Sequence, residues 1–224
     1  MPVSVAFVIP VLNEAPRIAD LLDRLARDFP AARRIVIDGG STDATVTLAM
    51  PRCDELLLAD PGRARQMNLG GRVCTADYLV FLHADTYPEF AAATLENALA
   101  RSPVWGFCPL RLSGQHWLLR WVERGINWRS RASGVATGDQ MLFLRRDVFT
   151  AQRGFSDIPL MEDVELSKRL RRLAPPRVLP LPVLTSSRRW EQRGILRTVM
   201  QMWGLRLAYA CGVPPTTLWR YYYG

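Results

Sequence analysis

Short apolar runs alternate with segments of helical periodicity along the first hundred residues, and this alternation strongly constrains the fold. The run 3–9 is continuous and rich in β-branched residues, and it ends at Pro10. Further strands are expected at 34–37, 55–58 and 78–82, and helices at 14–29, 45–49, 62–74 and 88–100. Strands joined through helices form a mostly parallel sheet with right-handed crossovers, so we expect an α/β domain.

The second half of the chain is less regular. We expect strands at 105–112 and 141–144, helices at 160–173 and 194–211, a proline-rich connection at 175–182 and an aromatic tail at 219–223. With 224 residues, of which 49% are apolar and 22% charged, the chain is long enough for one good core. We predict a main domain over 1–190 and a C-terminal helical extension over 191–224 that packs on it.

The formal net charge is +8, and Lys168 is the single lysine, so nearly all of the positive charge is arginine. A genome rich in G and C explains this as readily as an anionic ligand does, and charge alone does not separate nucleotide, nucleic acid and membrane surface. The four cysteines show no metal-ligand spacing, which fits free thiols. We find neither a signal peptide nor an apolar run near the ~20 residues of a membrane span, and predict a cytoplasmic protein.

Polar side chains gather where three of the predicted strands end. Asn13 and Glu14 follow the first strand, residues 38–43 follow the second, and residues 83–85 follow the fourth. In open parallel sheets, ligands bind outside the carboxyl ends of the strands. The sequence therefore predicts one binding site along this edge.

Individual residues of this edge suit a nucleoside-diphosphate ligand. Asp85 can meet a divalent cation held by a diphosphate, because hard cations prefer oxygen ligands; alternatively it caps the next helix. Asp38 can accept a hydrogen bond from a base-ring N–H, or it is a turn residue. For Ser41 and Asp43 we favour N-caps of the helix that follows.

Charged residues begin two of the predicted helices, and each group has both a functional and a structural interpretation. Arg63 and Arg65 open a helix, where they favour phosphate or form a solvated face. Glu162, Asp163 and Glu165 begin another helix, where they compensate the helix dipole or supply a general base. The approach to these acids is apolar, and a carboxylate in apolar surroundings has a raised pKa, so we favour Asp163 as the base.

Cations and an aromatic side chain come together late in the chain. Arg188, Arg189 and Trp190 can clamp a diphosphate or stack on a sugar, or they decorate the surface. The two histidines, His83 and His116, pair with no cysteine in sequence. We therefore predict neither a zinc site nor a catalytic triad.

Taken together, these segments resemble the family 2 glycosyltransferases of the GT-A fold. The resemblance rests on VIPVLNE at 8–14, IDGGSTD at 37–43, GRA at 62–64 with Asn68 and Gly70, LHAD at 82–85 and MED at 161–163. It extends over the first 190 residues. It implies a Rossmann-like, mostly parallel mixed sheet flanked by helices, and transfer of a sugar from a nucleoside diphosphate to an acceptor hydroxyl.

The resemblance also implies roles for particular residues. Its donor-binding residues are Pro10, Asn13, Glu14, Asp38, Arg63, Asn68 and Asp85. Its candidates for diphosphate or acceptor contacts are Asp139, Gln140, Arg188, Arg189 and Trp190. Asp85 is implied to bind Mg²⁺ or Mn²⁺, and Asp163, next to Glu162, to deprotonate the acceptor so that the transfer inverts the sugar's stereochemistry.

More narrowly, residues 136–140, 159–167 and 187–191 resemble a bacterial subgroup often labelled as glycosyltransferases associated with arsenosugar biosynthesis. Three positions depart from the wider family. Gly39 stands where many members have a second aspartate, and His83 replaces the first acid of the usual metal motif. Ser186 stands where processive relatives have glutamine before Arg-Trp, which favours a single transfer over polymer synthesis.

Rival functions remain open from sequence alone. The altered metal motif suggests a non-catalytic nucleotide-sugar binder. The mixture of tryptophan, arginine and tyrosine over 190–219 suggests a membrane-surface adaptor. Alternatively, that segment packs on the core or on a second copy in a homo-oligomer. A sugar-phosphate nucleotidyltransferase would open with a glycine-rich loop, which residues 10–14 are not. No recognised motif supports nucleic-acid binding.

Overall fold

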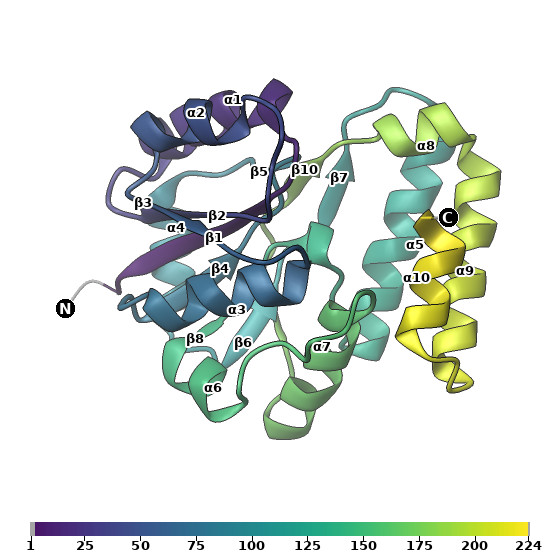
Figure 1. Ribbon diagram of the computed structural model, residues 1–224. Coiled ribbons are helices and arrows are strands. Elements are labelled where there is room, and N and C mark those ends of the chain that lie inside the picture. The colour runs from purple at the N-terminus through teal and green to yellow at the C-terminus, as the bar shows by residue number, and fades with distance from the viewer. Residues whose placement is uncertain (1–2, 224) are drawn as a thin grey trace.

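The computed structural model describes residues 3–223, which form a seven-stranded sheet of order β3-β2-β1-β4-β8-β6-β9 (Figure 1). All of its strand pairs are parallel except those of β8, which runs antiparallel to both β4 and β6. The strands are β1 Val5–Val11, β2 Arg33–Asp38, β3 Glu55–Leu58, β4 Tyr78–Phe81, β6 Trp105–Phe107, β8 Leu142–Arg145 and β9 Arg177–Val178. The expected α/β fold with a mostly parallel mixed sheet is confirmed.

Helices cover both faces of this sheet (Figure 1). They are α1 Ala15–Asp28, α2 Thr45–Ala49, α3 Arg63–Val73, α4 Ala92–Leu99, α5 Trp117–Ser133, α6 Arg146–Ala151, α7 Glu162–Leu173, α8 Arg188–Arg193, α9 Ile195–Ala210 and α10 Pro215–Tyr223. Side chains of α1, α4 and α5 share one core cluster with Phe7 and Ile9 of β1, whereas those of α3, α6 and α7 share the other with Ala6 and Val8. Successive residues of β1 therefore serve opposite cores, as a pleated strand requires.

Pro10 does not end the first strand, contrary to our expectation. It lies inside β1, where it is paired with Ile37 of β2, while the pairing of β1 with β4 extends only to Val8. Beyond Val8, β1 has no β4 residue to pair with, so the missing N–H of Pro10 costs no hydrogen bond between these two strands. The strand continues to Val11 and delivers the next loop to the sheet edge.

The predicted strand over 105–112 is divided between two sheets. Its first part is β6, and its second part, β7 Leu110–Leu112, belongs to a small sheet of order β5-β10-β7 with β5 Thr86–Pro88 and β10 Val183–Thr185. This small sheet brings two distant segments together, since the Ser186 amide donates to the Asp85 carbonyl at 3.1 Å. The loop after β4 is thereby tied to the segment that precedes α8.

The sequence analysis missed α5, a helix of 17 residues that ends at Gly134 in the left-handed conformation (φ 62°). Its inner face carries Leu119 and Glu123, but Trp121 and other tryptophans point outward, so the apolar period that would reveal the helix is blurred. The aromatic tail also proves to be helical, as α10. Over the described range 3–223, no helix is long and apolar enough to cross a membrane.

Candidate active site

The loops that follow β1 and β2 are joined by Asn13. The side-chain Oδ1 of Asn13 accepts from the Thr42 backbone amide at 2.9 Å, and the backbone amide of Asn13 donates to Ser41 Oγ at 2.8 Å. Asn13 adopts a φ of 55°, a left-handed conformation that asparagine tolerates better than most residues. Ser41 is not the N-cap that we expected, because it holds the Asn13 loop. Asp43 is not the N-cap either, since Ala44 occupies that position of α2, although Asp43 accepts from the Thr45 amide at 3.0 Å.

Asp38 has one satisfied and one unsatisfied carboxylate oxygen. The side chain is only 2% exposed, and its Oδ2 accepts from the amides of Gly40 and Ser41 at 2.9 Å each. Its Oδ1 is buried without a hydrogen-bond partner. A buried acceptor without a donor is costly, so this atom is suited to receive an N–H group from a ligand.

Gln66 is a residue of this edge that the sequence analysis missed. It is 3% exposed, and its Nε2 donates to the carbonyls of Val11 and Ile37 at 2.8 Å each, which joins the carboxyl ends of β1 and β2. A Cβ placed at Gly39 would lie 3.0 Å from the Gln66 amide group. Gln66 thus occupies the space beside Gly39 that the second aspartate of many relatives would need. No sequence pattern indicated this role for Gln66.

Asn68 and Glu14 use their side chains within the protein. The Asn68 side-chain amide donates to the Phe155 carbonyl and accepts from the Phe155 backbone amide, both at 2.8 Å, so it fixes the chain before α7. Glu14 pairs with Arg17 at 2.9 Å. Asn68 therefore has a positioning role, and its expected contact with the donor remains a prediction.

Asp85 borders a cleft of about 210 Å³ that also involves Arg17, Asp20, Thr86 and Ser186. Its carboxylate is exposed and accepts one long bond, from the Thr86 hydroxyl at 3.4 Å, so most of its lone pairs are free for a cation. Within residues 3–223, no group of three histidine, cysteine or acidic side chains is placed to hold a metal. Asp85 fits a divalent cation only if the ligand supplies the remaining oxygens.

His83 and Asp139 form the second charged group of the edge. His83 Nδ1 lies 3.1 Å from Asp139 Oδ1, and an ionised carboxylate only accepts, so Nδ1 carries the proton. Desolvation acts to raise the pKa of Asp139, but the His83 bond and the charges of Arg63 and Arg189 lower it on balance. A Cβ on Gly138 would lie 2.4 Å from the His83 ring, so only glycine fits beside it.

The two acids at the start of α7 differ in environment. Glu162 is 6% exposed, and burial together with the charge of Asp163 raises its pKa. Asp163 is half-buried and accepts from the amides of Gly138 and Val164 at 2.7 Å each. The burial that we expected for Asp163 is found at Glu162, and the groups that act on Glu162 include the charges of Asp163, Arg63 and His83.

Two arginines beside Asp163 escaped the sequence analysis. Burial and the charge of Arg206 on α9 lower the pKa of Arg129 on α5 to about 10, while Asp163 opposes this change. Burial likewise lowers the pKa of Arg206, against the influence of Asp163. Arg129 Nε is buried without a partner among the described residues.

Two further candidates, Gln140 and Trp190, contact the interior of the protein. Gln140 is fully buried, and its Oε1 accepts from Ser130 and Thr137, which holds the short 3₁₀ turn Gly138–Gln140. Trp190 is partly buried and packs against one of the two core clusters. Arg188 is exposed, and Arg189 lies over the Tyr222 ring at 4.0 Å.

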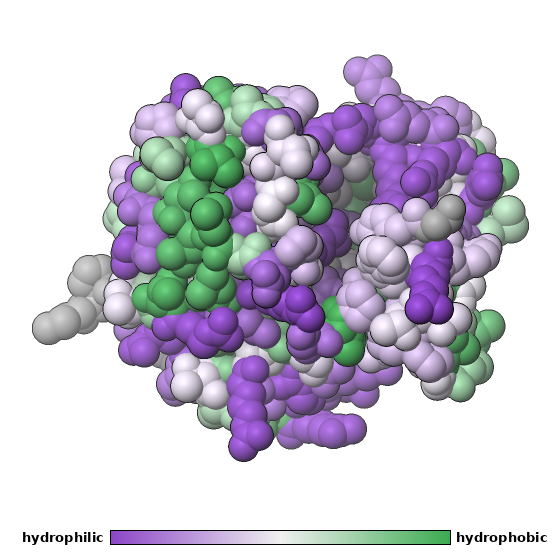
Figure 2. All heavy atoms as spheres, viewed as in Figure 1, coloured by the Kyte–Doolittle hydropathy of each residue, from purple (hydrophilic) through white to green (hydrophobic). Residues whose placement is uncertain are grey.

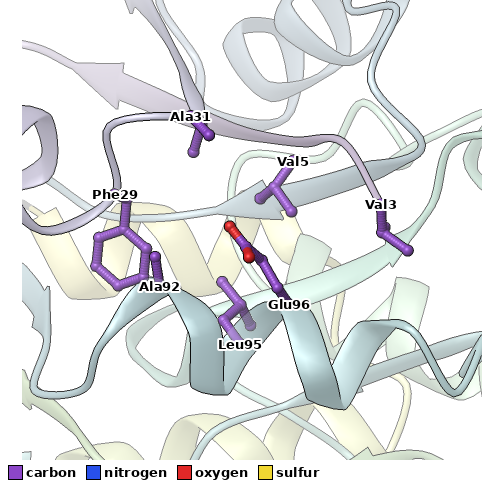
Figure 3. A pocket seen from close by; sticks show the side chains of 8 residues that line it. Val3, Val5, Phe29, Ala31, Ala92, Leu95 and Glu96 are labelled. Carbon is purple, nitrogen blue, oxygen red and sulfur yellow. The ribbon is translucent and has the colours of Figure 1, made fainter. Parts of the chain in front are cut away.

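A smaller pocket lies elsewhere in the molecule (Figure 3). Its volume is about 20 Å³, and it is formed by Val3, Val5, Phe29, Leu95 and Glu96, among others. Val3 and Val5 precede and begin β1, so this pocket lies at the opposite end of the strand from Asp38 and Asp85. With one charged side chain and room for about one water molecule, it offers nothing to a nucleotide.

A mostly parallel sheet whose carboxyl edge carries carboxylates and arginines defines an α/β domain of the GT-A kind. Residues 6–149 match the family described as "Glycosyl transferase family 2". This match covers more than half of the chain, which therefore belongs to that family. It ends before Asp163, so the acids of α7 lie outside it.

Among curated proteins, the chain is similar to the succinoglycan biosynthesis protein ExoA of Rhizobium meliloti (strain 1021), with 35% identity over 109 residues, or 43% of this chain and 33% of ExoA. Among solved structures it is similar to S. aureus TarS with UDP-GlcNAc (TM-score 0.63, 15% identity, 82% of this chain and 58% of that one). It is also similar to the mannosyltransferase PcManGT of Pyrobaculum calidifontis (TM-score 0.62, 21% identity, 91% and 60%). The chain thus spans a third of ExoA and about three fifths of the two solved chains.

Proposed function

We propose that this protein transfers a sugar from a nucleoside-diphosphate sugar to an acceptor hydroxyl, in one non-processive step with inversion. The observation that carries the proposal is the unpartnered, buried Oδ1 of Asp38, at the same edge as the free carboxylate of Asp85. Two proteins of similar fold add support, since TarS was solved with UDP-GlcNAc and PcManGT with GDP-Man and Mn²⁺.

In this proposal the donor lies across the carboxyl ends of β1, β2 and β4. Asp38 Oδ1 accepts from an N–H of the base, a contact that a buried carboxylate makes strongly. The Asn13 loop, which is held against Ser41 and Thr42, closes over the nucleoside. Arg63, at the first turn of α3, adds positive charge where helix amides already favour phosphate.

Asp85 is the proposed ligand for Mg²⁺ or Mn²⁺, with diphosphate oxygens completing the coordination. When bound there, the cation would supply positive charge beside the departing diphosphate. The Asp139 carboxylate is bonded to His83 Nδ1 at 3.1 Å, whereas the Asp85 carboxylate is not bonded to His83. Asp85 is therefore the carboxylate available to a cation. We therefore expect weak metal binding until the donor is present.

Asp163 is the proposed general base. It takes the proton of the acceptor hydroxyl as that oxygen bonds to the anomeric carbon, while the bond from that carbon to the diphosphate breaks on the opposite side. The Gly138 amide at 2.7 Å fixes the carboxylate, and Glu162, whose raised pKa favours a proton, lies beside it. One displacement of this kind inverts the stereochemistry.

The acceptor in this proposal carries a negative group. Arg129 has a buried Nε without a partner among the described residues, and the charge of Asp163 raises the pKa of both Arg129 and Arg206 against the effect of burial. A carboxylate or phosphate on the acceptor would pair with these arginines beside the base. The association with arsenosugar biosynthesis and a cytoplasmic location remain predictions from sequence, and we propose in addition that the transferred sugar is a hexose.

A thermal-shift panel of nucleoside diphosphates and their sugars, with Mn²⁺, Mg²⁺ or chelator, tests the donor site. Ligand at 100 times its Kd should stabilise the fold by about 2.7 kcal/mol. We expect a metal-dependent rise in Tm with one nucleotide, which Asp85→Ala abolishes and Asp163→Ala preserves. No rise with any nucleotide, in a well-folded sample, would overturn the proposal.

The second candidate function is a nucleotide-sugar binder without activity, which the replacement of an acid by His83 favours. It predicts the same thermal shifts but no turnover. Incubation of the bound donor with a mixed acceptor extract, followed by detection of the released nucleoside diphosphate, separates the two. Release that depends on Asp163 supports the transferase, and release of pyrophosphate from a nucleoside triphosphate would instead indicate a nucleotidyltransferase.

A further inference from the structure

Two helices beside the sheet each present a row of large apolar side chains to solvent. On α5 the row consists of Trp117, Trp121 and Trp128, and on α9 of Leu196, Met200, Trp203 and Leu207. All seven are between 63% and 72% exposed. Single exposed apolar residues are ordinary, but two ordered rows of this length mark an interaction surface.

The rows lie opposite the buried faces of their helices. Leu119 and Glu123 face inward from α5, and Thr198 and Leu205 face inward from α9. At 100° per residue, the exposed rows fall on the other side of each helix. The two helices pack against each other, and hydrophobic side chains reach the right-hand edge of the molecule over α9 (Figures 1 and 2).

The exposed charges of α5 and of residues 194–223 are all positive. Residues 194–224 contain no aspartate or glutamate, and the only acid of α5, Glu123, is buried and bonded to the Leu112 amide. The arginines of the region are solvent-exposed at Arg124, Arg131, Arg197 and Arg220. A symmetric contact with a second copy would set these arginines against each other, because both copies present the same patch.

We propose that the rows of α5 and α9 form a docking surface for an anionic phospholipid bilayer. Tryptophan suits the level of the lipid headgroups, the aliphatic residues of α9 enter the acyl boundary, and the arginines meet lipid phosphates. The helices lie in the plane of the interface, which agrees with the lack of a spanning helix over 3–223. Docking requires neither nucleotide nor turnover.

Co-sedimentation of the full chain with vesicles tests this surface. We expect binding to vesicles of phosphatidylserine and phosphatidylcholine, weaker binding to phosphatidylcholine alone, and loss of the difference at high salt. Trp121→Ala combined with Trp203→Ala should lower the partition coefficient about tenfold. Arg124→Gln and Arg197→Gln should each lower it about fivefold on the anionic vesicles and leave neutral vesicles unaffected.

Matched controls come from exposed residues away from the surface. Leu58→Ala, at the 71% exposed end of β3, and Arg101→Gln, an exposed arginine after α4, should bind as the unmodified chain does. Quenching of tryptophan fluorescence by lipids with brominated acyl chains reports insertion without any substitution. Absence of both sedimentation and quenching overturns the proposal, and so does a dimer in light scattering that Trp121→Ala dissociates.

Discussion

Single residues set the chemistry of the edge through differences in burial. Glu162 and Asp163 are neighbours in sequence, yet one side chain is 6% exposed and the other half-buried, because a helix turns successive residues by 100°. The same reasoning applies to Asp38, whose two oxygens have different environments within one carboxylate. At this scale, position within an element matters more than residue type.

We expect Glu162 and Glu165, both on α7, to have opposite effects on how stability depends on pH. Burial raises the pKa of Glu162 above 4.5, so the folded state holds this proton more strongly than the unfolded state does, and stability falls as pH rises through that range. Glu162→Gln should therefore raise the free energy of unfolding at pH 7, and the gain should vanish below about pH 4.5. Urea unfolding across pH measures both.

Glu165 provides the matched control on the same helix. Desolvation acts to raise its pKa, but Arg169 and Ser156 lower it on balance, so its contribution is present at neutral pH and is lost as the solution is acidified. Glu165→Gln should therefore lower stability at pH 7. A destabilising Glu162→Gln, or equal pH profiles for the two variants, would contradict this account.

Asp38→Asn tests the unpartnered oxygen. The amide keeps an oxygen for the Gly40 and Ser41 amides but places an NH₂ group where Oδ1 now lies, so it repels the N–H of a base. Nucleotide affinity should fall by about 1–3 kcal/mol, while Tm should be preserved. Calorimetry measures the binding, with Asp43→Asn as the control that retains affinity.

At the scale of elements, side chains from helices place the loops of the edge. Gln66 of α3 joins β1 to β2, and Asn68, half a turn on, fixes Phe155 before α7. α3 therefore connects the proposed donor loops with the proposed base. Sequence patterns indicate where such a helix lies but do not reveal which of its polar residues reach across to other segments.

Gln66→Ala should destabilise the protein by about 2 kcal/mol, because it removes the buried amide that donates to the carbonyls of both Val11 and Ile37, and the Val11 carbonyl then keeps its bond from the Gly39 amide. Nucleotide affinity should fall as well, since the two strand ends lose their connection. Chemical denaturation and calorimetry measure the two effects. Arg65→Ala, which removes only the exposed pair with Asp157, should change stability by less than about 0.5 kcal/mol.

At the scale of the whole molecule, the C-terminal helices form a layer beside the sheet (Figure 1). α9 contacts α5, and α10 contacts α9, while Tyr222 of α10 lies against Arg189 of α8. The division into a domain over 1–190 and an extension over 191–224 remains a prediction. The layer nevertheless supplies the α9 row of the surface proposed to meet lipid, together with Arg206, whose pKa the charge of Asp163 raises.

Tyr222→Ala should loosen α10, because it removes the ring 4.0 Å from the Arg189 guanidinium and the apolar area buried with it. We expect a loss of about 2 kcal/mol in unfolding free energy. Hydrogen exchange should show faster exchange in α10 than in the unmodified chain. Tyr221→Ala, at a side chain that is 73% exposed, should leave both measurements unchanged.

The sequence by itself determined the alternation of strands and helices, the family motifs and the edge that carries Asp38 and Asp85, because these depend on periodicity and on near neighbours in the chain. It did not reveal α5, whose outward tryptophans obscure its period, nor Gln66, whose partners are distant in sequence. Only the tertiary structure decided which acid is buried and which oxygen lacks a partner. Burial and long-range hydrogen bonds are properties of segments brought together by folding, and no local pattern records them.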